Sequence, residues 1–201
     1  LTAVTDPLNH TSTRTYDAVG NILTTADALG HTTNYGYDAL DRTISTTDAA
    51  GQTTFMTYDR VGNLLSLTDP DQNKTSYTYD ALDRQLTDTN QLGLSRTYSY
   101  DAVGNETSIV DRNGRKTSYL YDALDRQTQE IWLDASNAPI RTTTRSYDAA
   151  SQLTSVSNLD SRYSYTYDRA GRLITVDNTG TPNTPNVLLS YGYDAVNNLI
   201  S

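Results

Sequence analysis

Aspartate is the residue type of this sequence with the greatest potential for chemistry. The 201 residues include 22 Asp but only two Glu, and the formal net charge is −9. Paired carboxylates can act as general acid and base, and clusters of them can bind calcium. Most of these Asp residues recur at two fixed positions of a repeat, where an Asp side chain accepts backbone N–H groups and closes a turn. We therefore predict a structural role for them and no catalytic residue among them.

Residues 69–73, with the sequence DPDQN, are the strongest candidate for a metal-binding loop. They lack the closing Glu of an EF-hand and the Gly-rich nonapeptide of calcium β-rolls. The sequence therefore predicts a turn at this position and no metal site.

The only two His residues, His10 and His31, occupy the same position of successive repeats. Later repeats carry quite different side chains at that position: Gln52, Asn73, Leu94 and Arg115. Such variety is typical of an exposed turn rather than of a ligand. With no Cys and no further His, the sequence predicts neither a zinc site nor a His-activated nucleophile. It contains no phosphate-binding loop either, so we predict that this chain is not an enzyme and needs no cofactor.

The composition argues against several other classes. An acidic chain with only two Lys is a poor match for nucleic acid, because neutralisation of phosphates supplies most non-specific affinity. No apolar run approaches the length that a membrane-spanning segment needs, and no basic-then-apolar leader opens the sequence. The 16 Tyr and 33 Thr favour strands, whereas few strong helix formers other than Leu and Ala are present.

A Tyr-Asp pair recurs along the whole sequence. The nine pairs are Tyr16-Asp17, Tyr37-Asp38, Tyr58-Asp59, Tyr79-Asp80, Tyr100-Asp101, Tyr121-Asp122, Tyr147-Asp148, Tyr167-Asp168 and Tyr193-Asp194. The first six recur at a constant spacing of 21, and the last three follow at spacings of 26, 20 and 26. Nine copies in phase predict a repeat architecture, and we interpret these residues as its structural signature.

One repeat shows which elements carry the pairs. In residues 74–79, Tyr77 and Tyr79 alternate with small polar residues, which predicts a strand. Residues 80–84 then form a turn, and residues 85–89 form a second strand. Nine such units predict an all-β ribbon of about 18 antiparallel strands in hairpins of about 21 residues. Each repeat has too few large apolar side chains for a thick core, so we expect a thin ribbon, curved as a solenoid or as a segment of a hollow shell.

Two roles are open for the Tyr residues. Same-phase Tyr residues in adjacent repeats lie two strands, or about 9.6 Å, apart and are too distant to stack. One role is cross-strand packing, with the gaps between Tyr side chains filled by apolar residues of the second strands. The other role is carbohydrate binding by exposed aromatic faces, for which Trp132 is the best single candidate contact. The expected gap-filling residues are Leu23, Ile44, Leu65 and Leu86.

The turns that follow the Tyr-Asp pairs alternate between two sequences. Val-Gly-Asn stands at residues 19–21, 61–63 and 103–105, and Leu-Asp-Arg at residues 40–42, 82–84 and 124–126. The unit of duplication is therefore two repeats. Either the alternation is inherited copying without structural meaning, or neighbouring turns need different shapes. In the second case one shape is based on Gly and the other is closed by a pair of the Asp41–Arg42 type.

The whole of residues 1–201 is predicted to be one repeat array, with regular repeats over 1–130 and irregular repeats with longer loops over 131–201. Two long connections, 132–142 and 178–186, are expected to be hairpin tips enlarged into solvent loops. The sequence begins and ends inside a repeat without capping units, which predicts a fragment of a larger protein. Its edge strands are expected to fray and to associate edge to edge.

The Tyr-Asp pairs and the residues around them resemble the YD repeats, or Rhs repeats, of Rhs polymorphic-toxin shells, of insecticidal toxin-complex shell subunits and of teneurins. The resemblance covers essentially the whole chain and is highly specific for this repeat class. It implies that the ribbon coils into part of a large hollow cocoon and that the protein is secreted or displayed at the cell surface. The Asp-Pro-x-Gly-Leu type of motif that ends many Rhs shells and is linked to self-cleavage is absent here, so neither cleavage nor toxin activity is expected of these residues.

Two functions follow from the resemblance. The first is a non-catalytic structural segment of a β-shell that encloses or presents a C-terminal effector or toxin, with the rest of its own polypeptide as partner. The alternative is a carbohydrate- or cell-surface-binding adhesion module, with a glycan as partner. Exposed aromatic rows would favour the second function, and buried Tyr residues would favour the first.

Overall fold

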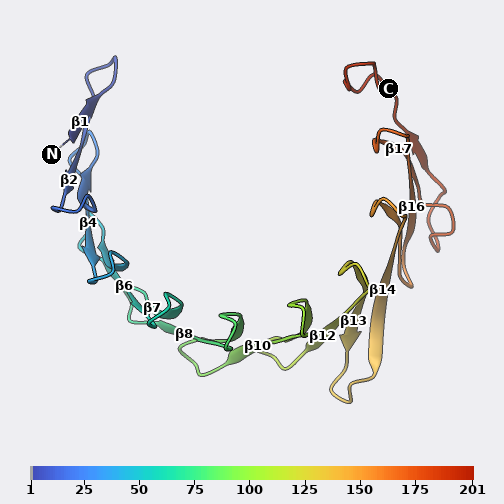
Figure 1. Cartoon of the computed structure of the whole chain (residues 1–201), viewed down its shortest axis with the longest axis horizontal. Helices are drawn as coiled ribbons and strands as arrows, with labels where there is room; N and C mark the ends of the chain where they lie inside the picture. The colour runs from blue at the N-terminus through green and yellow to red at the C-terminus, as the bar shows by residue number, and fades with distance from the viewer. Residues whose placement is uncertain (1) are drawn as a thin grey trace. The chain divides into compact units, whose positions relative to one another are not determined.

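The computed structural model describes residues 2–201, which form eighteen β-strands and no helix (Figure 1). The all-β class and the two strands per repeat predicted from the sequence are thereby confirmed. Contacts within the chain divide it into two compact units, one that ends at Arg96 and one that spans Thr97–Ser201. Neither unit needs a long-range crossover, because each strand pairs with the next one along the chain.

The first unit contains nine complete strands that pair antiparallel in sequence order. They are β1 (Thr2–Thr5), β2 (Thr11–Tyr16), β3 (Ile22–Ala26), β4 (Thr32–Tyr37), β5 (Thr43–Thr47), β6 (Thr53–Tyr58), β7 (Leu64–Thr68), β8 (Lys74–Tyr79) and β9 (Gln85–Thr89).

The second unit follows the same rule. Its strands are β10 (Ser95–Tyr100), which begins just before the boundary, β11 (Glu106–Val110), β12 (Lys116–Tyr121), β13 (Gln127–Leu133), β14 (Pro139–Tyr147), β15 (Leu153–Ser157), β16 (Arg162–Tyr167), β17 (Leu173–Asp177) and β18 (Leu188–Ser190).

A β-bulge recurs at the same place in eight of the nine repeats. In the hairpin β8–β9, Thr78 lies opposite Thr87 but Tyr79 lies opposite Gln85, so Leu86 has no partner. The same shift of register occurs at the repeat Tyr in each hairpin from β2–β3 to β16–β17. Because a bulge bends its strand and increases the local twist, regular bulges curve each ribbon along the order of its strands (Figure 1).

The bulge involves the residues that were expected to pack between the Tyr side chains. The second-strand residues expected to fill the gaps between Tyr side chains are the extra residues of the bulges. Three of them, Leu23, Ile44 and Leu65, are 36–39% exposed. Each of them directly precedes a residue of the opposite face, as Leu86 precedes Thr87, so it lies on the same face as the Tyr side chains, and the packing between Tyr and Leu stays a prediction.

No apolar side chain of residues 2–201 is buried. The three buried residues, Ser66, Asp88 and Asn178, are all polar. Each unit is thus a single layer of sheet without a hydrophobic core, as the shortage of large apolar residues predicted. Its stability has to come from backbone pairing and from contacts along the ribbon.

The two faces of the sheet differ in chemistry. The tyrosine face carries the Tyr side chains at the end of each first strand, such as Tyr77 and Tyr79 on β8. The hydroxyl face carries mainly Thr and Ser, which lie opposite each other in adjacent strands. Their side-chain oxygens are joined by hydrogen bonds of 2.7 Å in the pairs Thr15–Thr24, Thr57–Ser66 and Thr78–Thr87.

The two long connections have different structures. Most residues of the first one lengthen β13 and β14, which stay paired as far as Leu133 and Pro139. Its tip is a tight turn, in which the N–H of Asp134 donates to the carbonyl of Ala138 at 2.9 Å. The expected solvent loop is therefore an extended hairpin here. The second connection is a loop, held where the side-chain amide of Asn178 donates to the Pro185 carbonyl at 3.1 Å.

Candidate functional site

Each repeat Asp closes the turn between the two strands of its hairpin. In the fourth repeat, the N–H of Asp80 donates to the Arg84 carbonyl at 2.9 Å. Its Oδ1 accepts the N–H groups of Leu82 and Arg84 at 2.8 and 3.0 Å. The same three bonds are made by Asp17, Asp38, Asp59, Asp101, Asp122, Asp148, Asp168 and Asp194. Their carboxylates are therefore engaged with backbone groups, the arrangement of an Asx-turn.

In every repeat turn except that of Asp148, the second carboxylate oxygen binds the side chain four residues later. In the Leu-Asp-Arg turns this partner is Arg: Nε and Nη2 of Arg42 lie 2.7 Å from Oδ2 of Asp38. The predicted pair Asp41–Arg42 is wrong, because Asp41 is the turn residue with a left-handed backbone, at φ 59°. The bond from the Arg42 side chain holds the pKa of Asp38 below its ordinary value, and Arg126 does the same for Asp122.

Neighbouring turns do have different shapes. Gly20, Gly62 and Gly104 adopt φ between 103° and 107°, beyond the range that side chains tolerate well. The Asp residues at the corresponding position of the alternate turns, Asp41, Asp83 and Asp125, adopt φ between 58° and 60°, which Asp can reach. The structure therefore favours the second explanation of the two-repeat period.

The two turn types also bind each other along one edge of the ribbon, and we call this set of contacts the turn ladder. The Nδ2 of Asn63 in a Gly turn donates to Oδ1 of Asp83 in the next turn at 2.8 Å, and Asn21–Asp41 and Asn105–Asp125 repeat this bond at 2.7 and 2.9 Å. In the next step, Nη1 of an Arg donates to the main-chain carbonyl of the following repeat Asp. This bond joins Arg42 to Asp59 at 2.6 Å and Arg126 to Asp148 at 2.9 Å.

The repeat Tyr ties its own hairpin to the preceding one. The hydroxyl of Tyr79 donates at 2.9 Å to the carbonyl of Leu64, which lies beyond the paired part of β7 and β8. The ring of Tyr58 also lies under the guanidinium of Arg42, which is 4.9 Å from the ring centre. The same hydroxyl-to-carbonyl bond, at 2.8–3.0 Å, is made by Tyr37, Tyr58, Tyr121, Tyr147, Tyr167 and Tyr193.

Trp132 occupies an unusual position in its repeat. It stands eleven residues after Tyr121, where the preceding repeats place the Asp or Asn of a turn. Because β13 is extended, Trp132 instead lies in a strand, opposite Thr117 on one side and Arg141 on the other. Its indole N–H donates to Glu130 at 2.9 Å, and the residue is 46% exposed.

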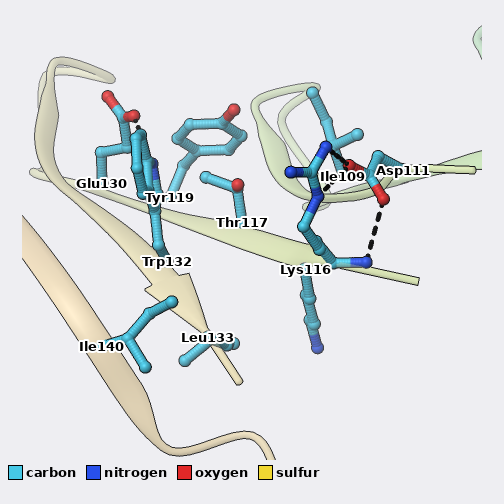
Figure 2. Close-up of a pocket in the computed structure, with 10 residues that line it drawn as sticks. Ile109, Asp111, Lys116, Thr117, Tyr119, Glu130, Trp132, Leu133 and Ile140 are labelled. Atoms are coloured by element: carbon cyan, nitrogen blue, oxygen red, sulfur yellow. Dashed lines mark hydrogen bonds and ion pairs between the residues drawn. The ribbon is translucent and has the colours of Figure 1, made fainter. Parts of the chain in front are cut away.

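A hollow of about 410 Å³ opens beside Trp132 (Figure 2). Thr117, Tyr119 and Glu130 contribute to its lining together with the Trp132 ring. The bond from Trp132, together with the Arg145 guanidinium, holds the pKa of Glu130 below its ordinary value. Burial, with the nearby charges of Glu106 and Glu130, raises the pKa of Tyr119. Trp132 was a predicted contact, whereas Tyr119 and Glu130 were not predicted from the sequence, although a Trp at a turn position is a signal of a lengthened hairpin.

The other candidate residues remain apart from this hollow. His10 and His31 lie in exposed turns, as predicted, with their Nδ1 atoms 2.9 and 2.8 Å from Asp6 and Asp27. Over the described part of the chain, no three His, Cys, Asp or Glu side chains gather in an arrangement that could hold a metal ion. Residues 2–201 also contain no helix with the length and apolar character needed to cross a membrane.

Comparison with known proteins identifies the repeat and the fold. The RHS Repeat family model matches residues 16–53, 58–92, 100–131 and 147–182. No curated protein matches the chain by sequence. The crystal structure of TcdB2-TccC3-Cdc42 is similar to 92% of this chain with a TM-score of 0.77 and 18% identity, and the match covers 12% of that chain. The Photorhabdus luminescens Tc holotoxin pore is similar to 92% of this chain with a TM-score of 0.61 and 17% identity, and the match covers 13% of that chain. The chain thus spans about an eighth of the length of these proteins, whose likeness to it is one of fold.

Proposed function

Because the chain belongs to the RHS repeat family, we propose that it is a non-catalytic structural segment in the β-shell of a large RHS-type protein. The observation that carries this proposal is the single-layer sheet: no apolar side chain of residues 2–201 is buried, and the repeats are joined through Tyr hydroxyls and the turn ladder. A sheet of this kind suits a wall, which has to be long and thin rather than compact.

The finer part of the proposal concerns what the wall surrounds. We propose that the shell encloses or presents a C-terminal effector or toxin, and that the partners of this segment are other parts of its own polypeptide. Secretion belongs to the same proposal. Support comes from the fold shared with parts of the TcdB2-TccC3 and Tc holotoxin structures, of which this chain matches 12–13%.

Limited proteolysis of the full-length polypeptide tests the shell role. Deletion of residues 59–100 removes one two-repeat period and should open the wall, so that the region after the repeats is cleaved much faster than in the intact protein. A control deletion of the exposed loop residues 181–185 should leave the cleavage rate unchanged. Equal cleavage of the intact protein and of the variant without residues 59–100 would contradict an enclosing role.

Catalysis is not part of the proposed function. The repeat carboxylates are engaged with backbone N–H groups, as Asp80 is with Leu82 and Arg84. We expect a panel of hydrolase and transferase substrates to show no turnover by this chain. Turnover that a single Asp→Asn change abolished would refute this expectation.

A second candidate function is binding of carbohydrate or of a cell surface. It is favoured by one observation, namely the half-exposed ring of Trp132 beside the hollow on the tyrosine face. The two functions are compatible, because a wall has an outer surface that can bind a partner.

A further inference from the structure

The extended hairpin β13–β14 creates the hollow. In the preceding repeat the residue at the position of Trp132 is Asp111, whose Oδ1 and Oδ2 close a turn with Arg115. The extra residues of the longer repeat continue the strand past this point. A large aromatic ring therefore stands across a small residue, Thr117, on the neighbouring strand. Figure 2 shows the Trp132 ring edge-on at one side of the hollow, with Thr117 between it and the turn that carries Asp111.

The Trp132 ring is held in one orientation. Its N–H is bonded to Oε1 of Glu130 at 2.9 Å, and Oε2 of the same carboxylate lies 3.1 Å from the Arg145 guanidinium. Arg141, its neighbour on β14, lies over the ring at 5.5 Å from the ring centre. Arg141 and Thr117 flank Trp132 from opposite strands, so Arg141 covers one ring face and the other ring face borders the hollow.

Polar groups with unused hydrogen-bonding capacity surround that free ring face. The Tyr119 hydroxyl makes no hydrogen bond within residues 2–201, whereas the Tyr121 hydroxyl on the same strand donates to the Glu106 carbonyl at 2.8 Å. The Glu130 carboxylate accepts a bond from Trp132 at one oxygen and from Arg145 at the other, and it can accept more, because a carboxylate has about four lone-pair sites. An aromatic plane with a hydroxyl and a carboxylate at its edge matches a ligand that has an apolar face and hydroxyl groups around its rim.

We propose that this hollow binds a saccharide, with one sugar ring stacked on Trp132 and its hydroxyl groups bonded to Tyr119 and Glu130. The inference rests on the second candidate function. The volume of about 410 Å³ lies within the ~300–1,000 Å³ typical of small-molecule sites. A cationic ligand fits less well, because Glu130 is paired with Arg145, Asp111 is paired with Arg115, and Arg141 already occupies the other face of the ring.

Titration of the purified chain with four defined sugars tests the proposal: cellobiose, lactose, maltose and 3′-sialyllactose. Trp132 is the only Trp, so a saturable change in its fluorescence reports on this site alone. Calorimetry then compares the sugar affinity of variants whose circular dichroism spectra match that of the parent and show that they are folded. Trp132→Ala should remove binding or weaken it at least about tenfold, and Tyr119→Phe should weaken it about three- to tenfold through the loss of one hydrogen bond. Phe55→Ala, which changes an aromatic residue that is 48% exposed outside the hollow, should leave affinity unchanged.

The outcomes separate this inference from the proposed functions. If calorimetry detects binding that both Trp132→Ala and Tyr119→Phe retain at full strength, the sugar binds elsewhere, and the site is refuted while the binding role stands. If none of the four sugars binds the parent chain, the site and the binding role both fall. Neither result bears on the shell segment, which the proteolysis experiment tests.

Discussion

The repeat Tyr and the repeat Asp both use their side chains to satisfy backbone groups. Asp80 accepts two N–H groups of its own turn, and Tyr79 donates to a carbonyl of the preceding repeat. A buried backbone group left without a partner costs about as much as a lost hydrogen bond. In a sheet without buried apolar side chains, these bonds take over part of the role that a hydrophobic core has in a compact domain.

At this scale we predict the effect of removing one hydroxyl group. Tyr79→Phe leaves the Leu64 carbonyl without its donor and should lower the free energy of unfolding by about 1 kcal/mol. Tyr79→Ala should cost more, but less than the ~3–5 kcal/mol of a fully buried aromatic, because Tyr79 is half-buried. Urea unfolding measures both changes. Tyr77→Phe is the control, since the Tyr77 hydroxyl has no hydrogen bond within residues 2–201. Equal effects of the two Phe variants would show that the bond from Tyr79 to the Leu64 carbonyl does not stabilise the fold.

Among the elements, the turns do more than reverse the chain. Gly62 and Asp83 stand at equivalent positions of neighbouring turns, at φ 107° and 60°, and the Asp side chain accepts a bond from Asn63 of the turn before it. A Gly at every turn could adopt the positive φ, but Asn63 would then lose its hydrogen-bond acceptor in the next turn. The alternation therefore gives each pair of turns one direct contact, which explains why the structural period is two repeats.

Three substitutions at Asp83 separate backbone from side chain. Asp83→Asn keeps an acceptor oxygen and tolerates positive φ, so stability should change by less than about 0.5 kcal/mol. Asp83→Gly keeps the backbone but loses the bond from Asn63, and a loss of about 0.5–1 kcal/mol is expected. Asp83→Ala loses the same bond and adds backbone strain, so it should be the least stable of the three variants, by about 1 kcal/mol relative to Asp83→Gly. Thermal melts rank them, and if the Gly and Asn variants prove equally stable the ladder bond contributes nothing.

For the molecule as a whole, the many turn carboxylates should make stability depend on pH. The pKa of Asp38 and of Asp122 is held below the ordinary 3.8, first by the side-chain bond from Arg42 or Arg126. Their contribution is therefore complete above about pH 4 and is lost as the pH falls through the folded-state pKa. We expect the melting temperature to be level between pH 7 and 5 and to drop below pH 4. A melting temperature that rose on acidification below pH 4 would contradict this assignment.

Glu106 should behave in the opposite way. Burial on the tyrosine face raises its pKa above the ordinary 4.5, so its charged form opposes folding at neutral pH. Glu106→Gln should raise the melting temperature at pH 7. The difference from the parent should vanish below about pH 4.5, where Glu106 is protonated in the folded and in the unfolded chain alike. A difference that is unchanged at pH 3.5 would show that charge is not the cause.

Protection from exchange should vary along the array. Within the described residues, β1 pairs with β2 alone and β18 with β17 alone, whereas β4 to β8 each have two neighbours. Strands with one neighbour open more easily, so amides of β4 to β8 should exchange at least about tenfold more slowly than those of β1 and β18. Hydrogen exchange measured by mass spectrometry checks this, and uniform protection would show that the edge strands are covered.

The strands and turns could be predicted from the sequence because they depend on local chemistry. The alternation around Tyr77 and Tyr79 and the turn-forming Asp80 are short-range signals, so they predicted strands, turns and a thin repeated sheet. The bulge at Leu86 was hidden, because it depends on pairing between two strands rather than on either strand alone.

Contacts between side chains of different turns and strands could not be predicted, because they depend on how the hairpins fold against one another. Arg42 binds Asp38 rather than Asp41 because the left-handed φ of Asp41 turns that carboxylate toward the preceding turn, where Asn21 donates to it. Trp132 reaches Thr117 and Glu130 because an insertion became strand instead of loop. Each of these contacts depends on register and on backbone dihedral angles across neighbouring hairpins, and residue spacing along one chain does not specify either.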